Sequence, residues 1–473
     1  MKKVKLTIII LLPVCVLALV IGIYFKGQQE NEKAAGSGEN AQTASLVGEP
    51  VGDLLQESEE QPEAEETLQE EELPEEVLPE EPAFEPYDIT MLALGDNLLH
   101  MGLINSGKQE DGSYDFGFEF EGIRDFLEVV DVAAINQETP LAGNALGFSG
   151  FPQFNGPTEV ADAIAQAGFK IVTAATNHAY DRGLSGLISH ANYWAETYPE
   201  ILTVGIHGDH SISFATDVDD KQYPHGGAGM AGPKAPDNIA FLNEQGITIA
   251  VLNYTYGNNY ETFPRELEGR LNMLCAYGDS SRTFDFTTLR QEVLDDIAYA
   301  DKVADLVVVF PHWGTEYRLT QTKYQELFAQ QMTDAGADLI IGAHPHVIEP
   351  IEHIVTENGK ESLCFYSLGN FAHTQQKAEC MLETMAWVTL HVEEDSVSVD
   401  YEKSGGLPMV CHYVGTNKHV EGVYLLEDYT EEMAAAHGLY PVVGVRLTKD
   451  YLETTADEVL GSWRMTRAQA LGE

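Results

Sequence analysis

The sequence is poor in basic residues and in cysteine. Its 473 residues contain 26 Lys and Arg against 76 Asp and Glu, which gives a formal net charge of −50. A chain this acidic repels the phosphate backbone, and this excludes nucleic-acid binding driven by counterion release. Its five scattered cysteines exclude a disulfide-dense scaffold. Hydrophobic residues still make up 44% of the chain, so a sizeable folded core is expected.

Sequence motifs of two common enzyme classes are also missing. No Gly-x-Ser-x-Gly elbow occurs, and no cysteine stands in a setting typical of a reactive thiol, which argues against nucleophilic catalysis. The Walker pattern, Gly-x4-Gly-Lys followed by Ser or Thr, is absent as well. Phosphoryl transfer of the P-loop type is therefore disfavoured.

The amino-terminal segment, residues 1–27, predicts a membrane anchor. Residues 6–25 carry no charge, and a helix of that length spans a hydrocarbon core of about 30 Å. Lys2, Lys3 and Lys5 precede this run, and such a basic flank keeps the amino terminus in the cytoplasm. The competing interpretation, a cleaved signal peptide, requires a shorter apolar region and a small-residue cleavage site. We expect an uncleaved, single-pass anchor in the cell membrane.

Residues 28–87 predict a disordered acidic linker. They hold nineteen acidic residues and one base, Lys33, and include the run EEQPEAEETLQEEELPEEVLPEEP. Dense glutamates repel one another and proline interrupts helices, so an extended, solvated spacer is expected. Binding of cations or cell-wall polymers is the alternative role for these acids. The remainder of the chain would then lie outside the cytoplasmic membrane.

From residue 88 onward, the sequence predicts an α/β fold. Short apolar runs typical of buried strands alternate with amphipathic helical patterns, which indicates a largely central sheet. The expected strands are 89–96, 131–136, 169–175, 201–206, 247–254, 305–310 and 338–343. The expected helices are 157–168, 286–304 and 322–336. A period-two pattern at 384–402 predicts a hairpin.

Polar residues follow five of the expected strands at the point where each strand ends. Ligand sites in open α/β sheets form beyond the carboxyl ends of strands, so these side chains are expected to share one crevice. The candidates are Asp96, His100, Glu138, Asn177, His178, Asp181, His312, Glu316, His344 and His346. Carboxylates and imidazoles without thiolates suit Mn, Fe, Zn or Mg. So many ligands indicate two divalent metal ions, which would clamp the attacking and leaving oxygens of a phosphoryl displacement.

Seven motifs in a fixed order resemble the CapA family of poly-gamma-glutamate capsule synthesis proteins. The motifs are GDNLLH (95–100), NQETPL (136–141), FNGP (154–157), ATNHAYDRGLSGL (175–187), FPHWGTEY (310–317), GAHPHVIEP (342–350) and YSLGNF (366–371). The resemblance covers 88–375, the expected main domain, and leaves 376–473 as a C-terminal hairpin and helical extension that completes it. Because that family is similar to the calcineurin-like metallophosphoesterases, it implies a four-layer α/β sandwich that holds two metal ions.

The resemblance also implies roles for individual residues. The implied metal ligands are Asp96 on the first ion, Glu138 as the bridge, Asn177 and His312 on the second ion, and His344 and His346 divided between the two. His178 would protonate the leaving group as a general acid, with Asp181 as a second catalytic residue. Alternatively, His178 and Asp181 form a cap and turn before a helix near 183–198. The residues expected around the ligands are His100, Asn136, Glu316 and Asn370.

Two motifs depart from the phosphoesterase pattern. The usual Asp-x-His of the first motif begins at Asp96, but its third position is Leu98 and the nearest histidine is His100. The Gly-Asp-x-x-Asp of the second motif is replaced by Asn-Gln-Glu at 136–138. These departures motivate the alternative that the domain is a non-catalytic scaffold that binds polymer.

The anchor and the motifs together predict a function. We expect a membrane-anchored, extracytoplasmic protein of poly-gamma-glutamate capsule biosynthesis or export with a metal-dependent, hydrolase-like site. Its expected partners are an anionic polymer and the membrane subunits for capsule synthesis and export. A phosphoesterase that acts on another phosphorylated substrate of the cell envelope is the enzymatic alternative.

Overall fold

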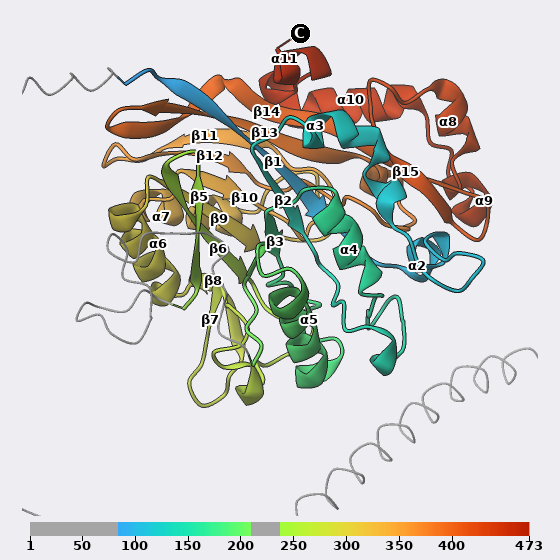
Figure 1. Cartoon of the computed structure of the whole chain (residues 1–473), viewed down its shortest axis with the longest axis horizontal. Helices are drawn as coiled ribbons and strands as arrows, with labels where there is room; N and C mark the ends of the chain where they lie inside the picture. The colour runs from blue at the N-terminus through green and yellow to red at the C-terminus, as the bar shows by residue number, and fades with distance from the viewer. Residues whose placement is uncertain (1–83, 210–236, 473) are drawn as a thin grey trace, which may run out of the picture. The chain divides into compact units, whose positions relative to one another are not determined.

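The computed structural model describes residues 84–209 and 237–472, and two large β-sheets dominate this part of the chain (Figure 1). The first sheet has seven strands in the order β15-β14-β13-β1-β2-β3-β4. Their bounds are β1 Tyr87–Asp96, β2 Val132–Asn136, β3 Ile171–Thr173, β4 Leu202–Val204, β13 Glu383–Glu393, β14 Ser396–Val414 and β15 His419–Leu425. Strands β1 to β4 run parallel to one another, whereas β13, β14 and β15 are antiparallel additions beside β1.

The second sheet has six strands in the order β11-β12-β10-β9-β6-β5. Their bounds are β5 Ile239–Glu244, β6 Ile247–Thr255, β9 Leu306–His312, β10 Leu339–Ile341, β11 Ile351–Val355 and β12 Glu361–Phe365. Strands β6, β9, β10 and β12 are parallel, and β5 and β11 pair antiparallel at the two edges. A separate two-stranded ribbon joins β7 Cys275–Tyr277 to β8 Phe284–Leu289.

Helices cover both outer faces of the pair of sheets (Figure 1). The α-helices are α2 Met101–Ser106, α3 Arg124–Leu127, α4 Glu159–Gln166, α5 Gly183–Thr197, α6 Gln291–Val303, α7 Lys323–Ala335, α8 Glu431–Ala436, α9 Leu439–Val443, α10 Lys449–Leu460 and α11 Arg467–Leu471. Thr322 caps α7 in a capping box, and Gly336 ends it in the left-handed conformation. These are the local signals that fix a helix at both ends.

Alternation along strand β9 shows how the layers are packed. Val307 and Val309 point into a core that they share with α6 and α7, whereas Leu306, Val308 and Phe310 point into a core shared with the seven-stranded sheet. Successive side chains of a strand leave opposite faces, so a strand buried on both sides is apolar throughout. On the far side, Phe126 of α3 packs against Trp387 of β13 with ring centroids 5.7 Å apart. The order of layers is helix, sheet, sheet, helix.

The predicted α/β sandwich is confirmed, but two of the expectations about its elements were wrong. The strands do not form one central sheet, because their apolar runs specify burial without specifying which strands pair. The helix expected over 286–304 begins only at Gln291, since Phe284–Leu289 forms strand β8. The β-branched threonines of that segment favour a strand. The predicted hairpin is present, with Glu393 paired to Ser396 at the turn between β13 and β14.

The predicted anchor and nearly all of the predicted linker lie outside the described residues. Tyr87, the last residue of that linker segment, already belongs to β1. Within 84–209 and 237–472, no helix has the length and apolar content needed to cross a membrane.

Candidate metal centre

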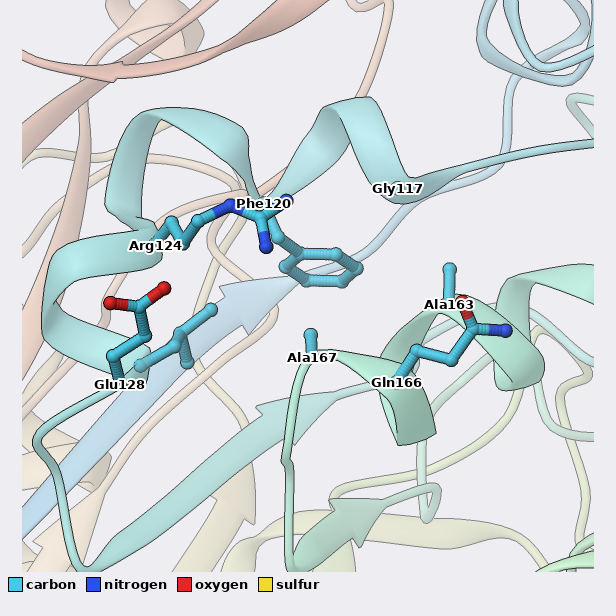
Figure 2. Close-up of a pocket in the computed structure, with 8 residues that line it drawn as sticks. Gly117, Phe120, Arg124, Glu128, Ala163, Gln166 and Ala167 are labelled. Atoms are coloured by element: carbon cyan, nitrogen blue, oxygen red, sulfur yellow. The ribbon is translucent and has the colours of Figure 1, made fainter.

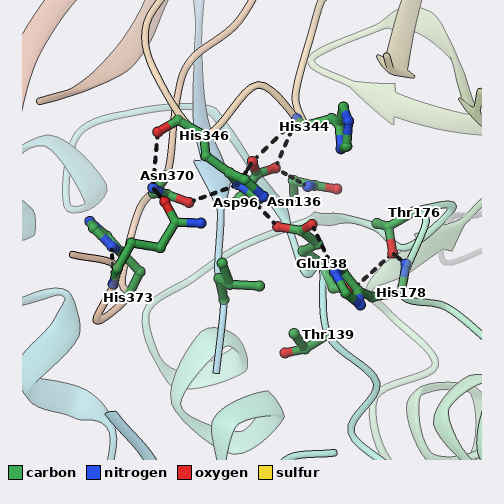
Figure 3. A network of polar contacts seen from close by, with 12 residues as sticks. Asp96, Asn136, Glu138, Thr139, Thr176, His178, His344, His346, Asn370 and His373 are labelled. Atoms are coloured by element: carbon green, nitrogen blue, oxygen red, sulfur yellow. Dashed lines mark hydrogen bonds and ion pairs between the residues drawn. The ribbon is translucent and has the colours of Figure 1, made fainter. Parts of the chain in front are cut away.

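The carboxyl ends of five strands meet at one place, as the strand-end pattern predicts. Asp96 is the last residue of β1, and Glu138 follows β2 by two residues. Asn177 and His178 follow β3 in the same sheet, whereas His312 ends β9 in the other sheet. Because β1, β2 and β3 are parallel, as are β9 and β10, these ends lie at matching edges of the two sheets. Figure 3 shows Asp96, Glu138, His178, His344 and His346 gathered there.

Two overlapping groups of buried side chains form the centre of this site. Asp96, Glu138 and His346 make one group, and Glu138, His312 and His344 make the other. Within each group, one ligand atom of each residue lies within 4.8 Å of the others. The His346 Nδ1 is 3.0 Å from Asp96 Oδ2 and 3.7 Å from Glu138 Oε2, and the His312 Nε2 is 3.7 Å from Glu138 Oε1. Glu138 therefore stands between the two groups.

Several ligand atoms of this centre have no hydrogen-bond partner among the described residues. They are both carboxylate oxygens of Glu138, Nδ1 of His312 and Nδ1 of His344. Buried polar atoms without a partner are costly, and the great majority in folded proteins are satisfied. Carboxylate oxygens and imidazole nitrogens are also the donors that Mn, Fe, Zn and Mg take in proteins. The residues present therefore fit divalent metal ions.

Electrostatics of the buried groups lead to the same conclusion. Burial, reinforced by the neighbouring Asp96, raises the pKa of Glu138 well above its ordinary value. Burial alone would lower the pKa of His346, but Glu138 and Asp96 outweigh it and raise that pKa to about 9. The pKa values of His312 and His344 are lowered by burial and by the neighbouring imidazoles. Two buried carboxylates thus lack sufficient positive charge, and a bound cation would supply it.

Asn177 and His178 stand beside the second group. The His312 Nε2 lies 2.8 Å from Asn177 Oδ1, and the His178 Nε2 lies 4.0 Å from Glu138 Oε1. The His178 Nδ1 is 2.7 Å from Asp181 Oδ2, which also accepts the backbone N–H of Phe154 at 2.7 Å. This contact fixes Nδ1 as the donor to Asp181 and leaves Nε2 toward the cluster. Asp181 thus holds the His178 ring, and α5 begins after Arg182 without a side-chain cap hydrogen bond.

Backbone geometry brings the ligand-bearing loops together. A Cβ on Gly95 would lie 2.1 Å from the Gly369 carbonyl oxygen, so only glycine allows the 366–371 loop to cross the end of β1 so closely. This crossing places Asn370 beside Asp96 in an isolated bridge. His344 and His346 both have positive φ, at 99° and 59°. Left-handed backbone at two non-glycine residues is strained, and such strain concentrates at functional sites.

The outer residues predicted from the sequence take different positions. Asn136 donates to Asp96 Oδ1 at 2.7 Å, and Asn370 lies with Oδ1 3.1 Å from His346 Nδ1. His100 belongs to neither group, because its ring packs edge-on against Phe154 with centroids 5.3 Å apart. Glu316 is exposed at the rim and acts on Glu138 only through its charge.

Three residues that contact the site carry no prediction from the sequence. Asn259 accepts from Asn177 Nδ2 and lies 3.1 Å from His178 Nδ1, and the Tyr256 ring centroid is 4.6 Å from that of His344. Both follow strand β6, which runs parallel to β9 and ends at the same edge. The polar run after the apolar strand at 247–254 was the signal for them. Phe154, whose ring packs edge-on against His178 at 4.7 Å, belongs to the FNGP motif (154–157), which carried no role for its ring.

Two cavities flank different parts of the fold. One of about 230 Å³ lies between α3 and α4, where Arg124 and Glu128 are the charged residues of the lining (Figure 2). It offers no histidine and no pair of carboxylates, so it lacks the donors for a metal. The other, of about 630 Å³, is lined by His100 and by Tyr317, whose ring centroid is 6.0 Å from that of His346. This second cavity adjoins the metal centre.

Comparison with known proteins relates the chain to bacterial capsule synthesis. The family described as "Bacterial capsule synthesis protein PGA_cap" matches residues 90–218 and 212–375. The PGA biosynthesis protein CapA of Bacillus subtilis (strain 168) is 31% identical over 208 residues, which cover 44% of this chain and 43% of that protein. The capsule biosynthesis protein CapA of Bacillus anthracis is 26% identical over 291 residues, which cover 61% and 60%. The chain thus spans less than two thirds of either relative.

Solved structures show only a distant likeness. A novel phosphatase from Mycoplasma pneumoniae is 12% identical, with 69% of this chain and 95% of that chain covered at a TM-score of 0.39. A 5'-nucleotidase from Candida albicans SC5314 is 11% identical, with 78% and 58% covered at a TM-score of 0.35.

Proposed function

The chain belongs to the PGA_cap family of bacterial capsule synthesis proteins, and from this membership we propose that it acts in making or exporting poly-gamma-glutamate through a metal-dependent hydrolytic site. The names of the two relatives refer to the biosynthesis of PGA and of capsule, and this supports poly-gamma-glutamate as the polymer. The observation that carries the hydrolytic part is the buried cluster around Glu138, whose ligand atoms lack hydrogen-bond partners. A purely structural cluster would satisfy these atoms internally.

Two divalent metal ions, of Mn, Fe, Zn or Mg, are the proposed cofactors. Asp96, Glu138 and His346 would hold one ion, and Glu138, His312 and His344, with Asn177 alongside, would hold the other. Such ions supply Lewis-acid polarisation of a substrate oxygen and acidify water near neutral pH. Asn136 donates a hydrogen bond to Asp96, and Asn370 contacts His346. These two contacts would keep the ligand side chains in place.

His178 would move the proton of the reaction. Asp181 holds its Nδ1, so the proton exchanged with substrate is the one at Nε2, on the side of Glu138. Phe154 packs against the His178 ring and reduces the access of water to that ring. An imidazole held in this way is suited to protonating a leaving group.

The proposed location is the outer face of the cytoplasmic membrane. The apolar run at 6–25 and the acidic segment at 28–87 support an anchor followed by a spacer. Membrane subunits for capsule synthesis and export are the proposed partners, because an exported polymer must be received where it emerges.

One observation favours a second candidate function. His100, the nearest histidine to the first motif, lies outside both ligand groups, so the first group contains a single imidazole. A domain with one weakened metal position can keep the fold and bind polymer without cleaving it. A phosphoesterase acting on another envelope phosphate would use the same ligand groups and differs only in substrate.

The test uses the full chain, purified and analysed for bound metal before and after chelation. We expect metal in the wild type, and hydrolysis of a chromogenic phosphoester or of poly-gamma-glutamate that chelation removes and added metal restores. His346→Ala should lose metal, whereas His178→Ala should keep metal and lose activity. His391→Ala is the matched control, because His391 is half-buried on β13, pairs with Asp88 and belongs to neither ligand group. The catalytic proposal would be refuted if the wild type contained no metal. It would also be refuted if cells carrying His178→Ala and Asn177→Ala produced an unchanged amount of polymer.

A further inference from the structure

The cavity of about 630 Å³ beside the metal centre is built from five separate segments. Its lining includes His100 and Met101 at the start of α2, Phe151 in the loop before α4, and Tyr317 after β9. The segment 374–377 and the turn between β14 and β15 close it with two lysines, Lys377 and Lys418. We refer to this space, lined by both, as the lysine cavity.

The charge of the lysine cavity is opposite to that of the chain. The chain holds nearly three acids for each base, yet the lining of this cavity contains two lysines, one histidine and no carboxylate. Neither lysine forms an ion pair with another described residue; the Lys377 Nζ lies instead 3.4 Å from the Tyr317 ring centroid. Burial lowers the pKa of Lys418, and no carboxylate offsets that cost. Unpaired ammonium groups in a recess are a site for anions.

Two side chains join the lysine cavity to the metal centre. The Tyr317 ring contacts the Lys377 ammonium, and its centroid is 6.0 Å from that of the His346 ring. Gln375 lines the cavity and accepts a hydrogen bond of 3.3 Å from Asn370 Nδ2. Asn370 in turn contacts His346 Nδ1 at 3.1 Å. A ligand in the cavity therefore lies one side chain away from the cluster.

The wall that carries Lys418 is held firmly in place. A Cβ on Gly102 would lie 2.8 Å from the Lys418 carbonyl oxygen, so α2 and the β14–β15 turn are packed as closely as glycine permits. The Val420 N–H donates to Ser106 Oγ at 2.8 Å and ties the same turn to the end of α2. The cavity is therefore preformed, which reduces the entropy lost on binding.

We propose that the lysine cavity binds the glutamyl chain that enters the metal centre, with its free carboxylates paired to Lys377 and Lys418. This inference rests on the proposed function and names the residues that would select a polycarboxylate. Phe151, which is 77% exposed, and Met101, which is 41% exposed, offer apolar surface for the methylene groups between the carboxylates. Both lysines lie beyond the family match, which ends at residue 375.

The experiment measures binding of a short oligo-gamma-glutamate to the full, metal-loaded chain by calorimetry. Lys377→Ala and Lys418→Ala should each weaken binding by about three- to fivefold, as expected for partly exposed ion pairs, and the double variant by about tenfold or more. Lys418→Arg should retain most of the affinity, and high salt should weaken wild-type binding toward that of the double variant. Lys323→Ala is the matched control, because Lys323 also lies over a tyrosine ring, that of Tyr324, but lines no part of the cavity.

Three outcomes would overturn the inference: no binding by the wild type, equal affinity in the double variant, or equal loss with Lys323→Ala. Binding of inorganic phosphate with the same affinity and the same dependence on both lysines would also overturn it, by showing a general anion site. Metal content and hydrolysis of a small chromogenic phosphoester are measured on the same samples. Metal content should be unchanged in the double variant, and the metal content and hydrolysis of the wild type report failure of the proposed function separately from failure of the cavity assignment.

Discussion

Replacing Glu138 with glutamine should stabilise the metal-free protein and weaken its stabilisation by metal. Both oxygens of this carboxylate are buried without a hydrogen-bond partner, and Asp96 lies in the same ligand group. A buried polar group left unsatisfied costs about 1–3 kcal/mol, and more when it is charged. Glu138→Gln keeps the shape and removes the ionisable group, so the folded state no longer bears the cost of burying its charge or of holding it protonated. The metal-free variant should therefore be more stable than the metal-free wild type by about 1–3 kcal/mol.

Metal should reduce or reverse that difference in stability. At a metal concentration of about 100 times the Kd, binding stabilises the wild type by about 2.7 kcal/mol. Loss of a ligand that serves both groups should weaken affinity by about 100-fold or more, and the same concentration would then stabilise the variant by only about 0.4 kcal/mol. Thermal melting with and without metal measures both the difference in stability between the metal-free proteins and the stabilisation of each protein by metal. A variant that gains as much from metal as the wild type would refute the role of Glu138.

The pH dependence of the metal-free protein gives an independent check. Burial and Asp96 raise the pKa of Glu138 above its ordinary value of 4.5, so the folded state keeps a proton that the unfolded chain releases. The stability from this group is complete below about pH 4.5 and is lost as pH rises toward the raised pKa. Glu138→Gln should remove this decline.

A matched control is available in Glu383, which is equally buried but fully paired. Its Oε1 is 2.9 Å from His373 Nε2, and its Oε2 accepts the Cys411 N–H at 2.8 Å. Glu383→Gln should leave the stabilisation by metal unchanged. If it abolished that stabilisation too, general disturbance of the fold would explain the result for Glu138.

Three further predictions concern other parts of the described chain. Asp181→Asn should keep bound metal but lower kcat by about 100-fold, because the amide no longer fixes the imidazole of His178, and an unchanged kcat would contradict this. Burial lowers the pKa of His190 to about 3 from 6.5, so stability falls by about 1.4 kcal/mol per pH unit below pH 6.5 as the unfolded chain takes up the proton. His190→Phe should remove that loss of stability, which urea unfolding at pH 7 and pH 5 measures. If the variant lost as much stability as the wild type, His190 would not be the group responsible. Gly95→Ala should destabilise the protein by about 2 kcal/mol or more and lower metal content, because the new Cβ meets the Gly369 carbonyl oxygen at 2.1 Å; a wild-type melting curve would exclude this clash.

Local patterns were sufficient to find most strands and many of the site residues. The apolar runs at 89–96 and 305–310 correspond to β1 and β9, and the polar residues that end them, Asp96 and His312, lie in the candidate metal centre. These local patterns are informative because the burial of a strand is encoded within a few consecutive residues. The apolar run at 247–254 likewise corresponds to β6, but Tyr256 and Asn259, which follow it and contact the site, are not among the predicted site residues.

Other features depended on contacts that are distant in the sequence. The joining of β13 to β1 pairs residues about three hundred positions apart, and the pattern of either strand permits many other partners. His100 illustrates the limit, because its position in the first motif suggested a place near the metal while its ring packs on Phe154 instead. Side-chain direction at the end of a strand follows from packing against other elements.

The sequence by itself determined which segments are buried, which strand ends carry carboxylates and imidazoles, and how negative charge is divided between the acidic segment and the rest. Tertiary structure decided which strands pair within the two sheets, which side chains share a ligand group with Glu138, and that Lys377 and Lys418 line one cavity in an acidic protein. The physical reason is that burial is a property of one segment and its period. A site is made by distances between segments, and these are fixed only when the two sheets pack together.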